Sequence, residues 1–458
     1  MPITSTHADY DAYKDKWQRC EDVAYGGEDA LHDAGEVYLP RLRDQASDDY
    51  KRMVARTPLF NAAWRTIDGL NGMLFRKPVK QEFPVGMDEY LTDVTMTGMG
   101  LQSFIQKIAY QDLAIGAYGV LVDYPEVNGD VGTVAQSRAF GLRPRVKLYK
   151  AVDVYNWRYG LVNNQNTLTE VRLKETEQIQ VNEWDSKTED RYRVLDLFEG
   201  VYRVRVYKVD GVSKQEILIS ERFPVMNGKN LDYIPFDWQQ EIEDPPLIDL
   251  INMNLHHYRI SSIKCNALPF AIPTMFIAGS LNLAEGEKIY VGSSKAIHSN
   301  DPASHAEYIE FSGQGLGAVE KEIDKTEQQM AILGARMLEQ QRKAVESSDT
   351  QQVHRKGEES ILAARAQVIS QRCTRFMSWF AEWAGFNGEV NIEVNRDFYP
   401  VGMTAQMLTA LMSSWQQGGI SDQVLFENLQ AAEIIGDDAT FEEEQQRIGD
   451  KPPVKPAI

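Results

Sequence analysis

The sequence predicts an α+β fold, in which a mainly antiparallel sheet and several long helices occupy separate stretches of the chain. Short segments of residues 120–238 alternate apolar and polar residues, which is typical of strands. Residues 1–75 and 311–383 instead repeat apolar residues at intervals of three and four, which is typical of helices. The two long helical patterns of 311–383 flank a polar hinge, Glu346–Gln352, and their narrow apolar seams require neighbours. We interpret them as part of a ring or bundle of subunits rather than of an enzyme built around a pocket.

The composition is that of a globular protein outside the membrane. Of the 458 residues 43% are hydrophobic, enough for a sizeable core, and 67 acids against 48 basic residues give a net charge of −19. That acidity opposes tight non-specific binding to nucleic acid. Three distant cysteines predict a reducing compartment without disulfides, and Met1–Tyr13 lacks the pattern of a secretory signal. The longest apolar stretch, Ala267–Ala278, contains two prolines and is shorter than the roughly 20 residues that span a bilayer.

The first half of the chain should contain helices separated by polar joints over residues 1–75, a further helix and then several strands. Apolar spacing predicts one helix over Tyr50–Phe75, which ends before Lys77-Pro78, and another over Leu101–Ala114. A strand should begin at Val120–Val122. Further strands are expected at Arg145–Tyr149, Tyr192–Phe198, Tyr202–Tyr207 and Glu216–Ile219, with a hairpin turn at Asp210-Gly211.

In the second half, a helix should begin at Asp244-Pro245-Pro246, because Asp is a preferred N-cap and proline suits the first helical turn. It should run to about Ala267, and residues 268–311 then show the punctuation of short strands and turns. The C-terminal part predicts helices over Thr404–Gln416 and Ser421–Ala432, and residues 420–450 hold nine acids against Arg447 alone.

The seams of the two long helices supply the candidate contacts between subunits. The second seam is the stricter, with steps of four and three from Leu362 to Trp383, and Thr326 fills a missing turn of the first. An aromatic cluster around Trp379 fits either a core or a subunit interface. The candidate interface residues are Val319, Ile323, Met330, Leu333, Met337, Leu362, Ile369, Phe376, Trp379 and Trp383.

No motif predicts catalysis, a cofactor or a metal. Gly313, Gly315 and Gly317 precede a helix, but the Rossmann and P-loop spacings are missing and acids follow at once. The adjacent residues His256 and His257 point about 100° apart on a helix, so they cannot chelate one metal well.

The order of these elements resembles that of the portal proteins of tailed bacteriophages. Local segments are also similar to one subgroup of portals, at Arg56–Asn61, Tyr308–Gly315 and Gln329–Leu338. The resemblance implies a portal-like closed homo-oligomeric ring with the following parts: a mixed α/β wing (1–244), a first stem helix (245–267), a small β-rich clip (268–311), a second stem helix (312–343), a tunnel loop (344–352), a long tunnel helix that returns to the wing (353–402), and a helical crown with an acidic tail (403–458).

The same resemblance implies a dodecamer at one capsid vertex, through which double-stranded DNA is packaged and later ejected with weak, non-specific contacts. Terminase and then adaptor or tail proteins would dock on the clip, and the major capsid protein and a scaffold protein would be further partners. We expect assembly in the host cytoplasm, a place in the virion and no membrane contact. The candidate channel residues are Lys321, Lys325, Arg336, Arg342, Lys343, Glu346, Ser347, Ser348, Asp349, Thr350, Gln351 and Gln352.

Two other hypotheses come from different classes of protein. A cytoplasmic coiled-coil scaffold or adaptor without a channel would explain the seams and the acidity, but less well the strand-rich insert between two helices. A nucleotide-dependent enzyme would require binding at Gly313–Gly317. Mass measurement separates the first from a portal, because a scaffold would form dimers to tetramers and a portal a closed ring of about twelve.

Overall fold

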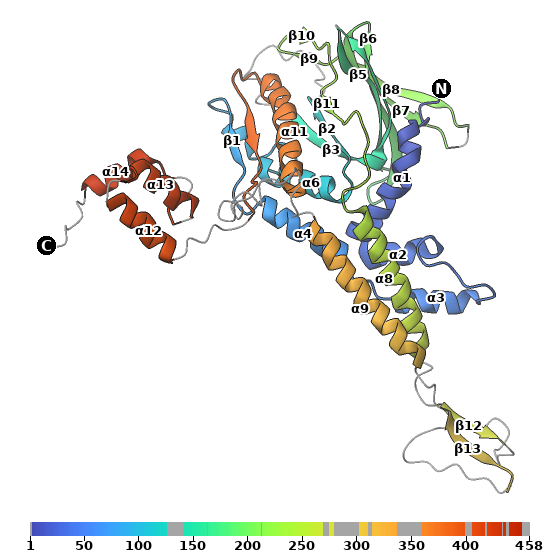
Figure 1. The fold of residues 1–458 in the computed structure, drawn as a ribbon. Helices are drawn as coiled ribbons and strands as arrows, with labels where there is room; N and C mark the ends of the chain where they lie inside the picture. The colour runs from blue at the N-terminus through green and yellow to red at the C-terminus, as the bar shows by residue number, and fades with distance from the viewer. Residues whose placement is uncertain are drawn as a thin grey trace.

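The computed structural model describes residues 2–125, 141–162, 164–211, 213–268, 274–278, 302–309, 314–336, 360–398, 405–416, 419–432, 434–436 and 439–450. A body of helices and sheets carries a two-helix stem that projects away from it, and three C-terminal helices lie to the other side (Figure 1). The α+β class predicted from the sequence is confirmed.

The first 74 residues form short helices around the base of the stem. They are α1 (Ala8–Cys20), η1 (Glu21–Gly26), α2 (Gly27–Ala34), η2 (Gly35–Val37), α3 (Ser47–Arg56) and α4 (Ala62–Leu74). The prediction of one helix over Tyr50–Phe75 is wrong. Thr57 has an extended backbone because it precedes Pro58, which disfavours the helical region, and Asn61 caps a new helix by accepting a bond from the Trp64 amide at 2.9 Å.

A small buried sheet forms the centre of the body. Its strand order is β11 (Phe236–Asp237), β2 (Tyr118–Asp123), β3 (Arg145–Lys150), and every residue of β2 is buried. Helices α6 (Leu101–Ala114) and α11 (Ile361–Trp383) pack against it. Gly119 allows β11 to approach β2 closely, because a Cβ there would lie 2.3 Å from the Phe236 ring. The predicted helix over Leu101–Ala114 and the strands at Val120–Val122 and Arg145–Tyr149 are confirmed.

The described chain also forms a five-stranded antiparallel sheet, in which consecutive strands are neighbours. The strands are β4 (Val154–Val162), β5 (Gln165–Gln180), β6 (Ser186–Phe198), β7 (Val201–Val209) and β8 (Glu216–Arg222). The three strands predicted in its second half are confirmed, as is the hairpin between β7 and β8. Strands β4 and β5 were not predicted as separate strands from the sequence.

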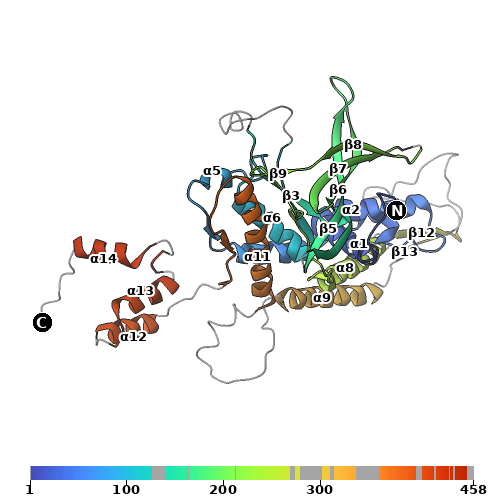
Figure 2. The ribbon, with the colours of Figure 1, turned by 90° about the horizontal axis from the view of Figure 1, so that it is seen from above.

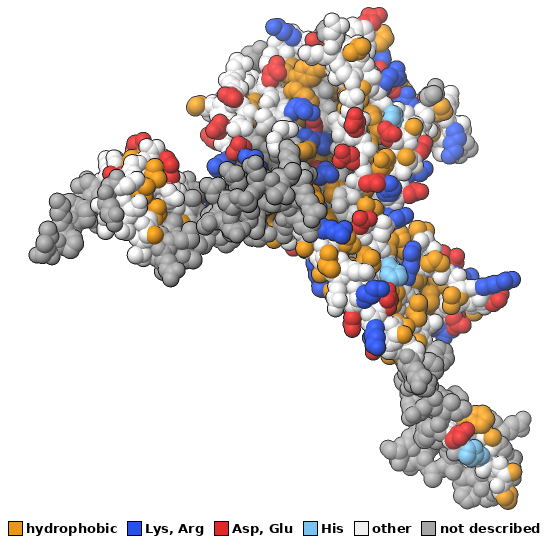
Figure 3. All heavy atoms as spheres, in the orientation of Figure 1, with side chains coloured by type: hydrophobic (Ala, Val, Ile, Leu, Met, Phe, Trp, Pro, Cys, Tyr) orange, Lys and Arg blue, Asp and Glu red, His pale blue; other side chains and the backbone are white. Residues whose placement is uncertain are grey.

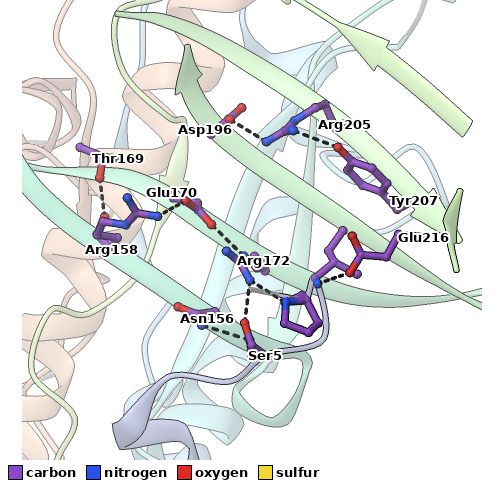
Figure 4. A network of polar contacts seen from close by, with 12 residues as sticks. Ser5, Asn156, Arg158, Thr169, Glu170, Arg172, Asp196, Arg205, Tyr207 and Glu216 are labelled. Carbon is purple, nitrogen blue, oxygen red and sulfur yellow. Dashed lines mark hydrogen bonds and ion pairs between the residues drawn. The ribbon is translucent and has the colours of Figure 1, made fainter. Parts of the chain in front are cut away.

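The N-terminal segment before α1 is bound to this sheet by polar contacts (Figure 4). Arg172 of β5 donates to the carbonyl of Pro2 at 3.0 Å and to Ser5 Oγ at 2.8 Å. The Ile3 amide donates to Glu216 of β8 at 2.6 Å, and the Ile3 side chain is buried. This segment therefore connects strands β5 and β8, which are not neighbours in the sheet.

The stem is an antiparallel pair, α8 (Ile248–Ala267) and α9 (Gln314–Ala335), with β12 (Thr274–Ala278) and β13 (His305–Ile309) paired at its far end (Figure 1). The strands expected within 268–311 are thus present. Asp244 is not the N-cap of α8 as predicted, because Leu247 occupies that position without a side-chain bond. Asp244 instead pairs with Lys16.

The chain after the stem contains helix α11 and the C-terminal helices α12 (Ala405–Gln416), α13 (Asp422–Ala431) and α14 (Phe441–Asp450). The Ser360 hydroxyl caps α11 by accepting a bond from the Ala363 amide at 3.2 Å. The remaining short elements are η3 (Ala151–Asp153), α5 (Asp88–Leu91), the pair β1 (Lys80–Glu82) with β14 (Asn391–Glu393), and the pair β9 (Val225–Met226) with β10 (Lys229–Asn230).

A charged cluster joins the two larger sheets. Glu175 of β5 contacts Lys147 at 2.6 Å and Arg193 at 3.1 Å, and Tyr149 also donates to it. Burial alone would raise the pKa of Glu175, but Arg193 and Lys147 outweigh it and lower the pKa to about 2. Ionised Glu175 therefore stabilises the packing of β3 against the five-stranded sheet.

This cluster predicts a dependence of stability on acid. Because the pKa of Glu175 falls from 4.5 to about 2 on folding, its contribution is complete above pH 4.5 and is lost as the pH falls towards 2. Glu175→Gln should lower the free energy of unfolding by about 3 kcal/mol at pH 7 and by much less near pH 2. Urea denaturation at both pH values measures this. The control Glu177→Gln, on the same strand with its side chain 60% exposed, should cost under about 1 kcal/mol. Equal losses at both pH values for Glu175→Gln would contradict the assignment.

Candidate assembly and channel site

The two stem helices are held in register by two polar contacts one heptad apart. Lys264 lies 3.0 Å from Glu320, and His257 lies 3.3 Å from Glu327. On each helix the two paired residues are seven positions apart. Because the helices are antiparallel, both pairs lie along the same line of contact between them. Burial lowers the pKa of His257, against the opposite effect of Glu327, so this residue favours the neutral form inside the stem.

Asn254 of α8 fixes the stem to the body. Its side chain is fully buried, accepts a bond from the Ala63 amide at 2.9 Å and donates to the Phe60 carbonyl at 3.0 Å. Ala63 lies in the first turn of α4, so Asn254 satisfies a backbone amide that the helix start leaves open, and it also binds the chain just before the helix. On the other stem helix, Gly334 approaches α4 so closely that a Cβ would lie 3.0 Å from Thr66.

The apolar seam of α9 faces its own chain. Thr326 and Met330 are buried, and Leu333 packs against the core of the body. The predicted role of Met330 between subunits is therefore corrected, since it is 2% exposed within the single chain. Val319 and Ile323, further along the stem, are half-buried, and their place in a subunit interface remains a prediction.

The described candidate channel cations, two on α9 and Arg336 directly after it, share one face. Lys321, Lys325 and Arg336 are all exposed, and their spacing of four and eleven residues places them within about 60° around the helix axis. The centre of this arc lies about 130° around the helix axis from the face formed by Thr326 and Met330. Lys325 also lies 3.6 Å from Glu322. Figure 3 shows positive and negative side chains interspersed along the visible side of the stem. The arrangement suits weak contacts with a polyanion better than tight binding.

Helix α11 is anchored by a buried carboxylate shared between two arginines. Asp237 of β11 is fully buried, accepts a bond from Arg372 Nε at 2.5 Å and from Arg375 Nη1 at 2.9 Å. Arg372 also donates to the Tyr118 carbonyl at 2.8 Å and lies 3.7 Å from the centre of the Tyr118 ring. Burial would lower the pKa of Arg372, but Asp237 outweighs it and the pKa is raised. The guanidinium therefore stays charged inside the body, where it joins α11 to the central sheet.

The seam of α11 is also buried within one chain, contrary to the predicted subunit interface. Leu362, Ile369 and Phe376 are fully buried, and Trp383 is 5% exposed, because this side of α11 packs against the body. The spacing of apolar residues correctly predicted the helix, but the surface that buries its seam belongs to the same chain and not to a neighbouring subunit. Trp379 is half-buried beside Tyr233, with ring centres 5.8 Å apart, and its role between subunits remains a prediction.

The remaining predicted site residues lie outside the described part of the chain. These are Met337, Arg342, Lys343, Glu346, Ser347, Ser348, Asp349, Thr350, Gln351 and Gln352. Gly315 and Gly317 are in α9 itself rather than in a loop before it, and Gly313 is not described. Across the described ranges no cluster of His, Cys, Asp or Glu could hold a metal ion. Nor does any described helix combine the length and the apolar character that crossing a bilayer demands.

Sequence reasoning missed the two residues that fix the helices in place, Asp237 and Asn254. Asp237 sits between aromatic residues of a short strand, and Asn254 interrupts the apolar residues of α8. A polar residue within an apolar segment was the available signal, but the partners are far away in sequence: Arg372 is 135 residues from Asp237, and Ala63 is 191 residues from Asn254.

A family model described as a domain of unknown function (DUF4055) matches residues 246–384. The match begins just before α8 and ends just after α11, so it covers the stem and the anchored helix but less than half of the chain. No curated protein matches the chain.

Solved structures match over most of the length at low identity. A chain of the virion of a native gene transfer agent particle is 12% identical, with 92% of this chain and 99% of that chain covered and a TM-score of 0.37. A chain of the neck of an empty gene transfer agent particle (C6 symmetry) is 11% identical, with coverages of 91% and 97% and a TM-score of 0.38. For the neck of the native particle (C12 symmetry) the values are 11%, 86%, 90% and 0.37.

The buried anchor generates a prediction about stability. Asp237→Ala leaves Arg372 buried without its carboxylate, which should lower the free energy of unfolding by about 3–5 kcal/mol. Arg375→Ala removes the second partner of the same carboxylate, but its side chain is 56% exposed, so the loss should stay below about 1 kcal/mol. Urea denaturation of both variants measures the difference. Similar losses for the two would show that the Asp237–Arg372 pair does not hold α11.

Proposed function

We propose that the chain is a portal subunit, which forms a closed ring of about twelve copies around a DNA channel at one vertex of a tailed-phage-like capsid. The observation that carries the proposal is the stem. Its two helices project from the body, and the described cations of α9 lie on the face turned away from the seam that packs against the same chain. In a ring, a face that is free in one copy is available to line a shared lumen.

The order of elements supports the same function. The β12–β13 pair at the free end of the stem corresponds to a clip, and we propose it as the docking surface for terminase and later for adaptor or tail proteins. Helix α11 at the base, fixed by Asp237, corresponds to a tunnel helix. At 1.5 Å per residue the 20 residues of α8 and the 22 of α9 extend about 30 Å, which is enough for a channel wall.

The charges of α9 suit the movement of DNA. Its described acids Glu320, Glu322, Asp324 and Glu327 nearly balance Lys321, Lys325 and Arg336. Each phosphate that a cation neutralises raises the affinity for DNA and makes that affinity more dependent on salt. A duplex should therefore slide most easily past a surface with few cations, some of them already paired with acids. We propose that this row gives weak, averaged phosphate contacts while the genome is packaged and ejected.

The structure weakens the scaffold hypothesis. A coiled-coil protein needs an apolar seam that is free to meet a partner helix. The stricter seam, on α11, is instead buried inside the body, and the seam of α9 packs against α8 and α4. A channel-forming ring needs no such free seam.

The proposal predicts the mass of the assembly. Native mass spectrometry of the purified protein should give closed rings near twelve times the 52.0 kDa chain, and negative-stain images should show a central hole. A population made only of monomers, dimers or tetramers at every concentration would contradict the proposal and favour an adaptor.

A second prediction concerns the cation row. Replacing Lys321, Lys325 and Arg336 by Gln should leave the ring mass unchanged, because these side chains are exposed. The affinity of the ring for double-stranded DNA should fall about tenfold at low salt, and its dependence on salt should flatten. A filter-binding titration at two salt concentrations measures both effects.

The matched control replaces three exposed lysines on the body, Lys80, Lys187 and Lys229, by Gln and should change neither quantity. If the two triple variants bound DNA equally well, the α9 row would not face the channel.

A further inference from the structure

A groove of about 320 Å³ in the body collects positive charge. It lies between α6, the β2–β3 pair and the Thr95–Met99 segment, and Lys107, Arg145, Lys147 and Arg193 line it. Arg145 and Lys147 keep 43% and 50% of their side chains exposed, and Lys107 is exposed as well. The cations are therefore accessible from solvent.

The carboxylates at the groove are too few to neutralise it. Asp123 lies 2.5 Å from Arg222, 3.1 Å from Arg145 and 4.0 Å from Arg193. Glu175 takes the remaining contacts of Arg193 and Lys147, and Lys107 has no acidic partner among the described residues. The four lining cations, with Arg222 beside Asp123, thus share two carboxylates.

The excess of positive charge at the groove affects the pKa of Asp123. Burial would raise the pKa of Asp123, but Arg222, Arg193 and Arg145 together lower it. Such a concentration of positive charge is unusual in a chain of net charge −19, and it favours an anionic ligand that supplies several carboxylates.

The strongest local excess of negative charge in this chain lies in its C-terminal helices. Residues 420–450 contain nine acids against Arg447, and Glu442, Glu443 and Glu444 form the first turn of α14. Helices α12, α13 and α14 are only 12, 10 and 10 residues long, and Phe426 is the one buried residue among their described side chains. Such short helices with little core need a further surface for stability.

In both ribbon views the C-terminal helices lie apart from the body (Figures 1 and 2). The groove and the acidic turn are thus two different patches of opposite charge on one chain. A cyclic ring is built from contacts of this heterologous kind, in which one patch of a copy meets a different patch of the next.

We propose that the cationic groove binds the acidic first turn of α14 of a second copy, so that the C-terminal helices of one subunit pack on the body of its neighbour. The inference rests on the proposed ring and adds to it a named contact. Lys107, Arg145 and Lys147 would meet Glu442, Glu443 and Glu444. A polyanionic nucleic acid is the alternative occupant, but the groove belongs to the body rather than to the stem, and a peptide carboxylate fits the fork of Arg145 equally well.

Charge reversal with compensation tests the contact in the full-length protein. Lys107→Glu with Thr97→Glu places negative charge in the groove without breaking an ion pair, since Thr97 is exposed and Lys107 is unpaired among the described residues. This variant should need about tenfold more protein for half-maximal ring assembly at low salt, measured by mass photometry. Glu442→Lys with Glu443→Lys should weaken assembly similarly. The protein that carries all four substitutions should assemble almost as the unchanged protein does.

Controls separate the possible failures. Lys80→Glu with Lys229→Glu adds comparable negative charge elsewhere on the body and should leave assembly unchanged, and thermal melts show that each variant folds. The inference is overturned if the groove variant assembles normally, if the fourfold variant shows no recovery, or if the groove variant loses only affinity for double-stranded DNA. A protein that forms no rings even without substitutions would instead overturn the proposed function.

Discussion

The buried carboxylate of Asp237 is the constraint on which the arrangement of the body depends. It accepts bonds from two arginines of α11 at once, and one of them, Arg372, also binds the backbone of β2. An ionised group in such a place is tolerated only when its partners satisfy it from every side. The strand, the helix and the central sheet can therefore pack in one register only.

Periodicity in the sequence identified the long helices but not their partners. The steps of four and three from Leu362 to Trp383 report that one side of α11 is buried, and this is what the structure shows. They do not report whether the burying surface belongs to the same chain. The central sheet, which was predicted only as separate strands, supplies that surface. The same reasoning applies to Met330 on α9, which α8 and α4 bury within one subunit.

Other features of the fold could not be predicted from short stretches of the sequence. Strand β5 shows no regular alternation, because its buried residues Leu168, Val171 and Leu173 are spaced by three and then two, and most residues beyond them are polar. The break between α3 and α4 could have been predicted from Pro58, but apolar residues that keep helical spacing on both sides of it favoured one helix. The pairings of Asp237 and Asn254 join segments more than a hundred residues apart, and nothing local specifies which polar residue meets which.

The two halves of the stem differ in how firmly they are supported. Near the body, Asn254 and Gly334 tie both helices to α4, and α3 packs against α8, whereas towards the tip Ile263 is 56% exposed. A rod clamped at one end bends mostly beyond its clamp. A force across the stem should therefore bend the outer turns of the helices. A force along the axis should instead be transmitted through Asn254 to α4. The stem would then be stiff to a load along its axis and flexible to a load across it.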